Sequence, residues 1–470
     1  MTVETSTPDV VVVGSGAGGA AAAGAAARAG ARVLVLEAGT AGDAGAHHRN
    51  ADPSEHDLAA FGAEIVGAFT PHGWGAAAPQ RAPGSGALHG LGGGLRLWTH
   101  HCPTPHPDEW PAVVPEADRA ALLDTARALL RVEPTALRDG ERQRRILAAL
   151  RERFPDLPAG RGVQPLPVAG YRDGGHVRYT GAAELLAAPD GAVEVRSGWA
   201  VRRVLTDGDR VRGVEAVHRT SGAVLRAHAP AVVVAGGAIG SAQLLHASGL
   251  RLPALGTHLH DHAMTTTRIV LDGHLLDAVP ADDAEFAVWV PSSPGHPRHL
   301  QVIRSPLAPG NRPTDDPAGR TADVVMFSPV VPRPENRLVL GAGPDDGLGL
   351  PAVSVVFDYA PADVDELAAA GAELLRVSTA LADLNAGRET AVLPVGASFH
   401  LMGTTRLGAD PADSVADPHG RVWGVEGLYV AGNGVLGAAN SGNPTLMTIA
   451  IALRTAAAVT ADAGTRTAAA

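Results

Sequence analysis

The residues VVVVGSGAGG at positions 10–19 give the strongest indication of the fold, because they join a strand signal to a glycine-rich turn. Its four valines predict a short buried strand. Gly14, Gly16 and Gly19 then follow at the spacing of a phosphate-binding turn, in which the first permits the tight bend, the second admits a pyrophosphate and the third lets a helix pack closely. The Ala-rich residues 20–29 predict that helix, with its N-terminus facing the phosphates.

A second strand and an acidic residue complete the pattern. Residues 32–36 suit a buried strand, and Glu37 ends it about twenty residues after the glycines, where a carboxylate binds ribose hydroxyls. We therefore predict a dinucleotide site, with a purely structural glycine turn as the alternative. The motif alone does not separate FAD from NAD, but its place at the start of the chain, far in sequence from the rest of the site, favours FAD.

The composition is that of a globular protein, with 470 residues of which 45% are hydrophobic and 19% charged. A formal net charge of −11 argues against nucleic acid as a partner, since phosphate binding needs a basic surface. All basic residues are Arg, so Lys is excluded as a catalytic group. The single Cys102 excludes an internal disulfide and predicts a cytoplasmic location. We expect no signal peptide and no membrane-spanning segment, because a basic n-region and an apolar run of sufficient length are both absent.

The rest of the chain predicts two kinds of structure. Residues 112–150 carry a helical pattern, and residues 193–217 alternate around Asp207-Gly208, which indicates a hairpin. Further expected strands are 231–235, 267–271, 286–290, 323–329 and 352–357, and further helices are 240–247, 362–384 and one from Thr445, before a disordered tail at 461–470. The change to strands and Pro-rich turns after residue 264 predicts a sheet-based second domain inserted into the first, and thus an α/β protein.

Four segments together resemble the glucose-methanol-choline (GMC) oxidoreductase family. They are the glycine motif, GGGLRLWT at 92–99 followed by Asp108-Glu109-Trp110, AGGAIGSAQLL at 235–245, and the C-terminal group FHLMGTTRLG at 399–408, LYVAGN at 428–433 and NPTL at 443–446. The wording of the C-terminal group is most similar to the pyranose-oxidase-like, sugar-oxidising branch. The resemblance implies a Rossmann-like FAD-binding domain from 1–100, 190–262 and 396–470, and an inserted antiparallel-sheet substrate-binding domain from 101–189 and 263–395.

The resemblance also implies FAD as the cofactor. Some relatives tether FAD through a His in the glycine loop, and Leu97 occupies that position here, so we predict noncovalent binding. The positions expected to contact FAD are Gly14, Gly16, Gly19, Glu37, Ala38, Gly93, Gly94, Trp98, Thr99, Val201, Ala235, Gly432, Asn433, Pro444 and Thr445.

Alcohol oxidation by a flavin needs a base for the hydroxyl proton, and histidine suits this task because its pKa lies near working pH. The resemblance assigns the base to His400 and a hydrogen bond to the same hydroxyl oxygen to Asn443. The alternatives are that His400 is a buried structural histidine and that Asn443, which precedes Pro444, only caps the helix from Thr445.

Two other histidine groups compete for a role. His258, His260 and His262 alternate as on a strand face, which would suit a metal, but no further acid or Cys completes a ligand set, so we predict no metal. The group His100, His101, Cys102 and His106 is interrupted by prolines and predicts a loop near the flavin, with Cys102 an inert thiol.

These inferences combine into a predicted reaction, the oxidation of a small-molecule alcohol to an aldehyde or ketone with hydride transfer to FAD, which O2 or another acceptor reoxidises. The expected substrate is a sugar, an aminosugar or a sugar-like polyol, for example in natural-product biosynthesis. The alternatives are another flavin reaction on this scaffold, such as a non-alcohol dehydrogenation or a lyase, and a nucleotide-binding protein without redox turnover. NAD-dependent chemistry would leave the C-terminal segments unexplained.

Overall fold

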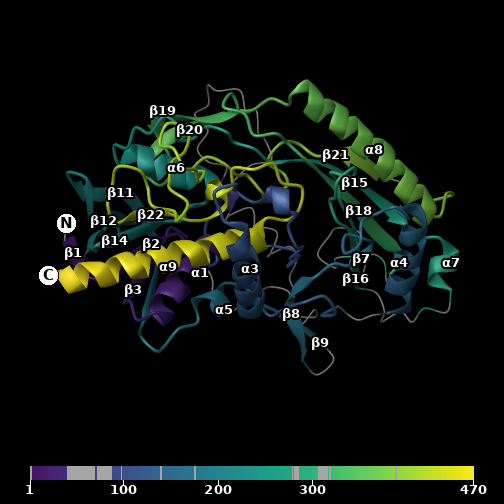
Figure 1. The fold of residues 1–470 in the computed structure, drawn as a ribbon, viewed down its shortest axis with the longest axis horizontal. Coiled ribbons are helices and arrows are strands. Elements are labelled where there is room, and N and C mark those ends of the chain that lie inside the picture. The colour runs from purple at the N-terminus through teal and green to yellow at the C-terminus, as the bar shows by residue number, and fades with distance from the viewer. Residues whose placement is uncertain are drawn as a thin grey trace.

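In the computed structural model, the described residues are 3–39, 69–70, 87–96, 98–137, 140–173, 176–277, 279, 285–304, 316, 319–386 and 389–469. Two sheets, each with its own hydrophobic core, lie at opposite ends of an elongated molecule (Figure 1). Both chain termini lie at the end that holds the first sheet (Figure 1).

The first sheet is parallel and collects strands from distant parts of the sequence. Its order is β10 (Val193–Ser197), β3 (Val33–Glu37), β2 (Val10–Val13), β14 (Ala231–Val234) and β22 (Leu428–Val430). Every neighbouring pair is parallel. All residues of β2, β3 and β14 are buried, as expected of parallel strands covered on both faces. The predicted Rossmann-like domain, assembled from separated segments, is therefore confirmed.

Helices pack on this sheet or on neighbouring elements of the same domain. They are α1 (Ala17–Arg28), α3 (Glu116–Leu130), α5 (Ala182–Leu186), α6 (Gly237–Ala247) and α9 (Thr445–Ala469). The helix α1 packs on both α5 and α9, and α3 also packs on α9 (Figure 1). A Cβ added at Gly24 would lie 1.9 Å from the carbonyl oxygen of Leu185, so only glycine permits the approach of α1 to α5.

A four-stranded sheet stands beside this layer and contains β1 (Val3–Ser6), β13 (Val224–His228), β12 (Arg210–His218) and β11 (Trp199–Asp207), in that order. The predicted hairpin is confirmed, since β11 and β12 pair antiparallel with Asp207 opposite Arg210 and with Gly208 at a φ of +60°.

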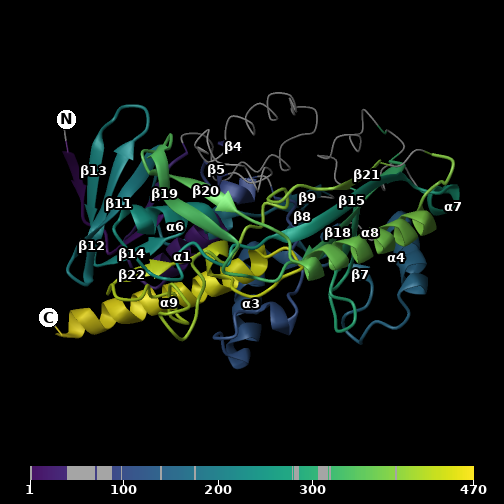
Figure 2. The ribbon, with the colours of Figure 1, turned by 90° about the horizontal axis from the view of Figure 1, so that it is seen from above.

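The second domain is built on a six-stranded antiparallel sheet, as predicted. Its order is β21 (Glu389–Val392), β15 (His262–Val270), β18 (Thr321–Pro329), β17 (His299–Arg304), β16 (Phe286–Val290) and β7 (Gln164–Pro165). The helices α8 (Pro361–Leu381) and α4 (Glu141–Arg153) pack against it, and α7 (Gly273–Leu276) contacts α4 (Figure 2). Smaller elements are β4 (Phe69–Thr70), β5 (Ala87–Leu88), β6 (Val132–Glu133), β8 (Val168–Asp173), β9 (His176–Tyr179), η2 (Gly93–Arg96), η3 (Pro107–Glu109) and η4 (Asn433–Val435).

The hairpin of β19 (Arg337–Asp345) and β20 (Pro351–Val356) packs on α6 of the first domain. Its buried Leu338, Val353 and Val355 belong to the first hydrophobic core, although the hairpin lies inside the range assigned to the second domain. The domain boundaries as a whole stay a prediction.

Two predictions about helices are wrong. Residues 112–150 form two helices, because α3 ends at Leu130, Arg131 adopts a left-handed φ of +49°, and Pro134 cannot continue a helix. The tail expected to be disordered from residue 461 is helical, since α9 continues to Ala469. Both errors come from tertiary packing and local backbone geometry that composition does not reveal.

The expectation that no segment has the length of a membrane span also needs correction. By length and composition alone, residues Thr445–Ala463 of α9 would suffice to cross a membrane, but 61% of that window is buried inside the protein. Because α9 packs against α1 and α3, its apolar character is explained as that of a core helix.

The two cores make a stability prediction. Ile146 of α4 is fully buried in the second core, so Ile146→Ala should lower the free energy of unfolding by about 2–5 kcal/mol. Arg144→Ala on the solvent side of the same helix should change it by less than about 0.5 kcal/mol. Chemical denaturation of the two variants measures both values, and equal effects would contradict the placement of α4.

Candidate functional site

The glycine turn after β2 is shaped by its own backbone. Gly14 has a φ of +94°, and a Cβ added there would lie 2.7 Å from the carbonyl oxygen of Ala235. A Cβ added at Gly19 would lie 2.0 Å from the oxygen of Gly14. Ala235, at the end of β14, donates its N–H to Val13 O at 2.8 Å. The tight turn and the close approach of α1 thus both require glycine.

Open space lies over two glycines of the same site. A Cβ added at Gly16 or at Gly432 would meet no heavy atom within 4 Å. Gly16 is the N-cap of α1 and provides no side-chain cap, so the first-turn N–H groups can receive an anion. A Cβ added at Gly18 would lie 2.5 Å from Gly432 N, which places the two glycine segments side by side. This backbone-lined hollow fits the pyrophosphate of a dinucleotide.

Glu37 fastens the glycine turn to the segment near Gly90. It is buried at the end of β3, and its Oε2 accepts hydrogen bonds from the N–H and the hydroxyl of Ser15 at 3.1 and 2.7 Å. Its Oε1 accepts from the N–H groups of Gly39 and Gly90 at 2.8 and 3.2 Å. These four bonds match the roughly four acceptor sites of a carboxylate, so the protein itself engages Glu37 fully, and its expected contact with FAD stays a prediction.

Further expected FAD contacts lie in η2 and just after it. Gly93 and Gly94 are in η2, which contacts α1, and a Cβ at Gly94 would meet open space. Trp98 Nε1 is buried and finds no hydrogen-bond partner among the described residues, as expected of a donor facing a ligand. Thr99 follows it directly, and Leu97, on which the prediction of noncovalent binding rests, lies outside the described residues.

Ala38 and Val201 are also expected to contact FAD. Ala38 follows Glu37, and its carbonyl oxygen accepts a hydrogen bond from Arg219 at 3.2 Å. Val201 is buried in β11, which contacts β3, beside an irregularity in the strand register.

The start of α9 joins the cofactor site to the second domain. Pro444 and Thr445 begin this helix, and Thr448 Oγ1 in its first turn donates to Asn433 Oδ1 at 2.6 Å. Asn433 opens η4 directly after Gly432. The last expected FAD contacts and the candidate catalytic Asn443 therefore belong to one connected segment.

His400 lies on a loop that a buried carboxylate holds in place. Asp261 accepts from Gly396 N at 2.8 Å and from the hydroxyl of Ser398, and that hydroxyl accepts from His400 N at 2.9 Å. Phe399 has a left-handed φ of +60°, which turns the chain just before the histidine. Burial raises the pKa of Asp261. The backbone of His400 is thus tied to the start of β15.

The imidazole of His400 packs between aromatic rings. The His262 ring lies 4.9 Å away at 89°, and the Phe327 ring lies 6.0 Å away. His400 Nδ1 is buried without a hydrogen-bond partner in the described part of the chain. Burial lowers the pKa of His400 to about 4, so the ring is neutral at working pH and can take up a proton.

Two of the alternating histidines, His260 and His262, contact the backbone of the loop before α9. His258 has a left-handed φ of +58°, so the three residues do not share one strand face. His262 Nδ1 donates to Asn440 O at 2.9 Å, and the ring nitrogens of His260 lie 2.9 Å from His258 O and 3.1 Å from Ala438 O. Within the described ranges, no group of three or more His, Cys, Asp or Glu side chains could hold a metal ion.

The amide of Asn443 is oriented by a residue that sequence reasoning missed. Gln301 Nε2 donates to Asn443 Oδ1 at 2.6 Å and lies 2.8 Å from His299 Nε2, so its two hydrogens serve both acceptors. Since Oδ1 is engaged, Asn443 presents its Nδ2 donor to a ligand. One sequence feature could have indicated Gln301. His299 and Gln301 are polar residues two positions apart, and so on the same face, in the strand β17, which is buried throughout.

Rings connect the two candidate catalytic residues. Phe327 lies 5.7 Å from the His299 ring and 6.0 Å from the His400 ring, and it pairs with His299 across β17 and β18. His400 and Asn443 thus border one cluster, His400 through Phe327 and Asn443 through Gln301.

The histidine and cysteine group near residue 100 has a packing role. The His100 ring lies between Trp98 at 4.8 Å and Tyr179 at 4.6 Å. Cys102 is fully buried, and burial raises the pKa of its thiol, so an inert thiol is the consistent interpretation.

Comparisons with known proteins identify relatives of this chain. Two sequence profiles, both described as GMC oxidoreductase, match residues 173–264 and 332–452. The chain is 33% identical to a C-glycoside 3-oxidase of Arthrobacter globiformis over 95% of its own length and 93% of the relative. It is 28% identical to a pyranose 2-oxidase of Tricholoma matsutake over 97% of its own length and 94% of the relative. A formate oxidase variant of Aspergillus oryzae has a similar fold, with a TM-score of 0.68, 16% identity, and coverage of 98% and 99%.

The glycine hollow predicts two distinct phenotypes. Gly16→Ala should fold normally, because a Cβ there meets no protein atom, but it should weaken FAD binding at least about tenfold by filling the space of the pyrophosphate. Gly19→Ala should lose both FAD and stability, because its Cβ would overlap the oxygen of Gly14. Flavin titration and thermal unfolding of the apoproteins separate the two, and normal FAD affinity of Gly16→Ala would refute the assignment.

Proposed function

Since the chain belongs to the GMC oxidoreductase family, we propose that it oxidises a ring hydroxyl of a pyranose or glycoside to a ketone, with O2 reoxidising the cofactor. FAD-dependent oxidation of a small-molecule alcohol is the activity that family membership establishes, and FAD is the cofactor. The sugar substrate and the use of O2 are proposed because the relatives named above are a C-glycoside 3-oxidase and a pyranose 2-oxidase.

His400 is the proposed base. Bound FAD supplies the acceptor for the hydride that leaves the carbinol carbon. The neutral imidazole takes the hydroxyl proton, so the O–H and C–H bonds both break and a carbonyl forms. The loop from Gly396 to His400, fastened to Asp261, fixes the position of the ring.

Asn443 is the proposed hydrogen-bond donor to the substrate oxygen. The observation that carries this role is the 2.6 Å bond from Gln301 to Asn443 Oδ1, because it leaves the donor side of the amide for a ligand. A donor of this kind holds the oxygen without competing for its proton and leaves His400 as the proton acceptor.

His262 supports a substrate with neighbouring hydroxyls. Its Nδ1 is committed to Asn440 O, so Nε2 carries a lone pair, and this buried atom has no partner among the residues placed by the structure. Because the ring stands 4.9 Å from His400, a second hydroxyl beside the reacting one would meet an acceptor.

Anaerobic flavin bleaching tests the proposal. Pyranoses or C-glycosides should reduce the flavin of the wild-type enzyme, and simple acyclic alcohols should do so far more slowly. His400→Ala should keep FAD but reduce the rate of bleaching by about 100-fold or more, because the hydroxyl proton loses its acceptor.

His274→Ala is the matched control, because this histidine is exposed on α7 and should leave the rate unchanged. Undiminished bleaching in His400→Ala would exclude the base. Failure of every sugar, with reduction by another alcohol class, would exclude the proposed substrate but leave the base in place.

The pH profile tests the state of the base. Since burial lowers the pKa of His400 to about 4, the ring stays neutral well below neutral pH. We expect kcat/KM to change less than about twofold between about pH 7 and about pH 5.5, where a base of ordinary pKa would be only about one-tenth neutral. Steady-state kinetics with a parallel check of flavin retention measure this, and a fall of about eightfold by about pH 5.5, as expected of a base with an ordinary pKa, would contradict the lowered pKa.

A further inference from the structure

Glu109 is a buried carboxylate that the proposed chemistry does not use. It ends η3 and is 6% exposed. In the described part of the chain it forms no ion pair within 4.0 Å. A buried charge without a direct counter-ion must be stabilised by hydrogen bonds, so the partners of Glu109 show which parts of the chain it holds together.

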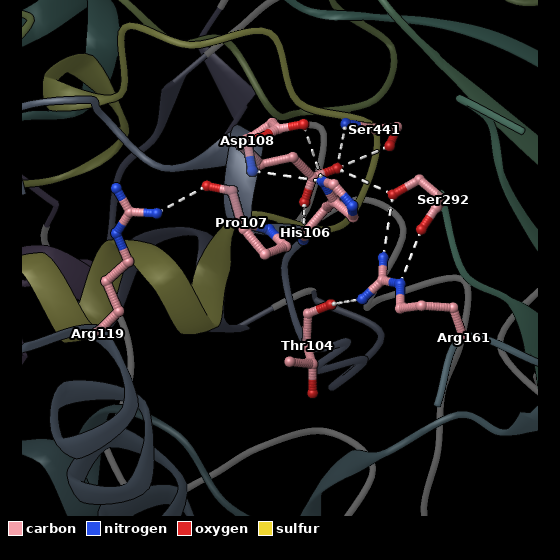
Figure 3. A network of polar contacts seen from close by, with 9 residues as sticks. Thr104, His106, Pro107, Asp108, Arg119, Arg161, Ser292 and Ser441 are labelled. Atoms are coloured by element: carbon pink, nitrogen blue, oxygen red, sulfur yellow. Dashed lines mark hydrogen bonds and ion pairs between the residues drawn. The ribbon is translucent and has the colours of Figure 1, made fainter. Parts of the chain in front are cut away.

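Four donors from three chain segments converge on this carboxylate. Its Oε2 accepts from His106 N at 2.8 Å. Its Oε1 accepts from Ser441 N at 3.0 Å, from the Ser441 hydroxyl at 2.7 Å and from the Ser292 hydroxyl at 3.3 Å. Figure 3 shows Ser441 and Ser292 pointing toward this centre from two sides. Two of these partners are backbone N–H groups, which can only donate, so both carboxylate oxygens act as acceptors here.

A second layer orients one of these donors. Arg161 donates to Ser292 O at 2.8 Å, to Ser292 Oγ at 3.2 Å and to Thr104 O at 3.1 Å (Figure 3). Since the Ser292 hydroxyl accepts from Arg161, its own hydrogen is directed to Glu109. The network joins the segment before η3, the chain after β16 and the loop before α9.

The contact with Ser441 acts two residues before Asn443. Gly442 between them has no side chain, and a Cβ added there would lie 3.6 Å from His299 Nδ1 and 4.0 Å from Glu109 Oε2. Pro444 restricts Asn443 to extended conformations. Gly442 therefore has the widest allowed range of backbone angles in this loop, and the fixed point before it is Ser441, held twice by Glu109.

We propose that Glu109 is a positioning residue that fixes the backbone before Asn443, so that the Asn443 amide meets the substrate oxygen in the reacting geometry. The proposal rests on the proposed role of Asn443. Gln301 holds the side-chain end of Asn443, and Glu109 holds the main-chain end. Loss of either contact lets the amide move relative to His400.

A double-mutant cycle on the FAD-loaded enzyme tests the proposal. Glu109→Gln replaces an acceptor by an NH2 group that faces a donor, so kcat should fall about tenfold with KM and FAD content unchanged. In an Asn443→Ala background the same change should have no further effect on kcat, because the group that Glu109 positions is gone.

Glu373→Gln is the matched control. Glu373 is also buried, but it pairs with His296 and Arg298 in the second domain and does not contact the loop before α9. Its effect on kcat, if any, should be the same with and without Asn443. If the effect of Glu373→Gln on kcat also disappeared in the Asn443→Ala background, the cycle would not be specific for contacts to the loop before α9, and the proposal would be overturned.

The outcomes separate the two hypotheses. Full activity of Asn443→Ala would refute the proposed function of that residue. An impaired Asn443→Ala in which Glu109→Gln still costs about tenfold would overturn only the role of Glu109. If Glu109→Gln fails to fold, Ser441→Ala removes the 2.7 Å hydroxyl contact and keeps the backbone one. It should lower kcat about threefold, again only when Asn443 is present.

Discussion

The parallel pairing of β14 with β2 on one side and β22 on the other brings the parts of the cofactor site together. It aligns the carboxyl ends of strands from residues 10–13, 231–234 and 428–430. The glycine turn, Ala235 and Gly432 then converge, because the carboxyl ends of parallel strands form one edge. The strands β2 and β14 are wholly buried, so the burial of their apolar side chains stabilises this alignment. If another strand took the place of β14 beside β2, the three segments would separate and the hollow for the pyrophosphate would be lost.

The segment between β22 and α9 connects this edge of the parallel sheet to residues next to the second domain. Side chains from several elements hold its backbone: His260 at Ala438, His262 at Asn440 and Glu109 at Ser441. Buried polar groups are costly unless they are hydrogen-bonded, and here each bond also fixes a loop atom. The histidines that looked like a metal set from their spacing are better explained as supports for this segment.

Local signals predicted much of the architecture. The glycine turn, its two strands and the hairpin at Asp207 could be inferred, because each depends on residues close together in sequence. The pattern after residue 264 indicated a sheet, but its antiparallel form came from the family resemblance, since the sheet pairs segments as distant as β15 and β21. The break after Leu130 was missed, since it depends on one left-handed residue in an otherwise helical pattern. The resemblance to a family supplied His400 and Asn443, which no spacing argument distinguishes from a structural histidine and a helix cap.

The supports of the candidate site could not be predicted in the same way. Gln301 and Asn443 are separated by 142 positions, and Glu109 and Ser441 by 332. Nothing in the neighbouring sequence of either partner indicates the contact. A buried carboxylate or amide is informative only once the packing shows which donors surround it, and that is set by the arrangement of both sheets.

The protonation states of these groups restrict what the site can bind. His400 is neutral, His262 has its only hydrogen committed to Asn440 O, and His299 accepts from Gln301. Burial lowers the pKa of all three rings, so none readily becomes a donor by protonation. Around the proposed reaction point His262 Nε2 and the proposed base His400 therefore supply the acceptors, and Asn443 supplies a donor. A ligand that satisfies this arrangement must bring its own O–H groups, which a polyhydroxylated ring does and a hydrocarbon or an ether does not.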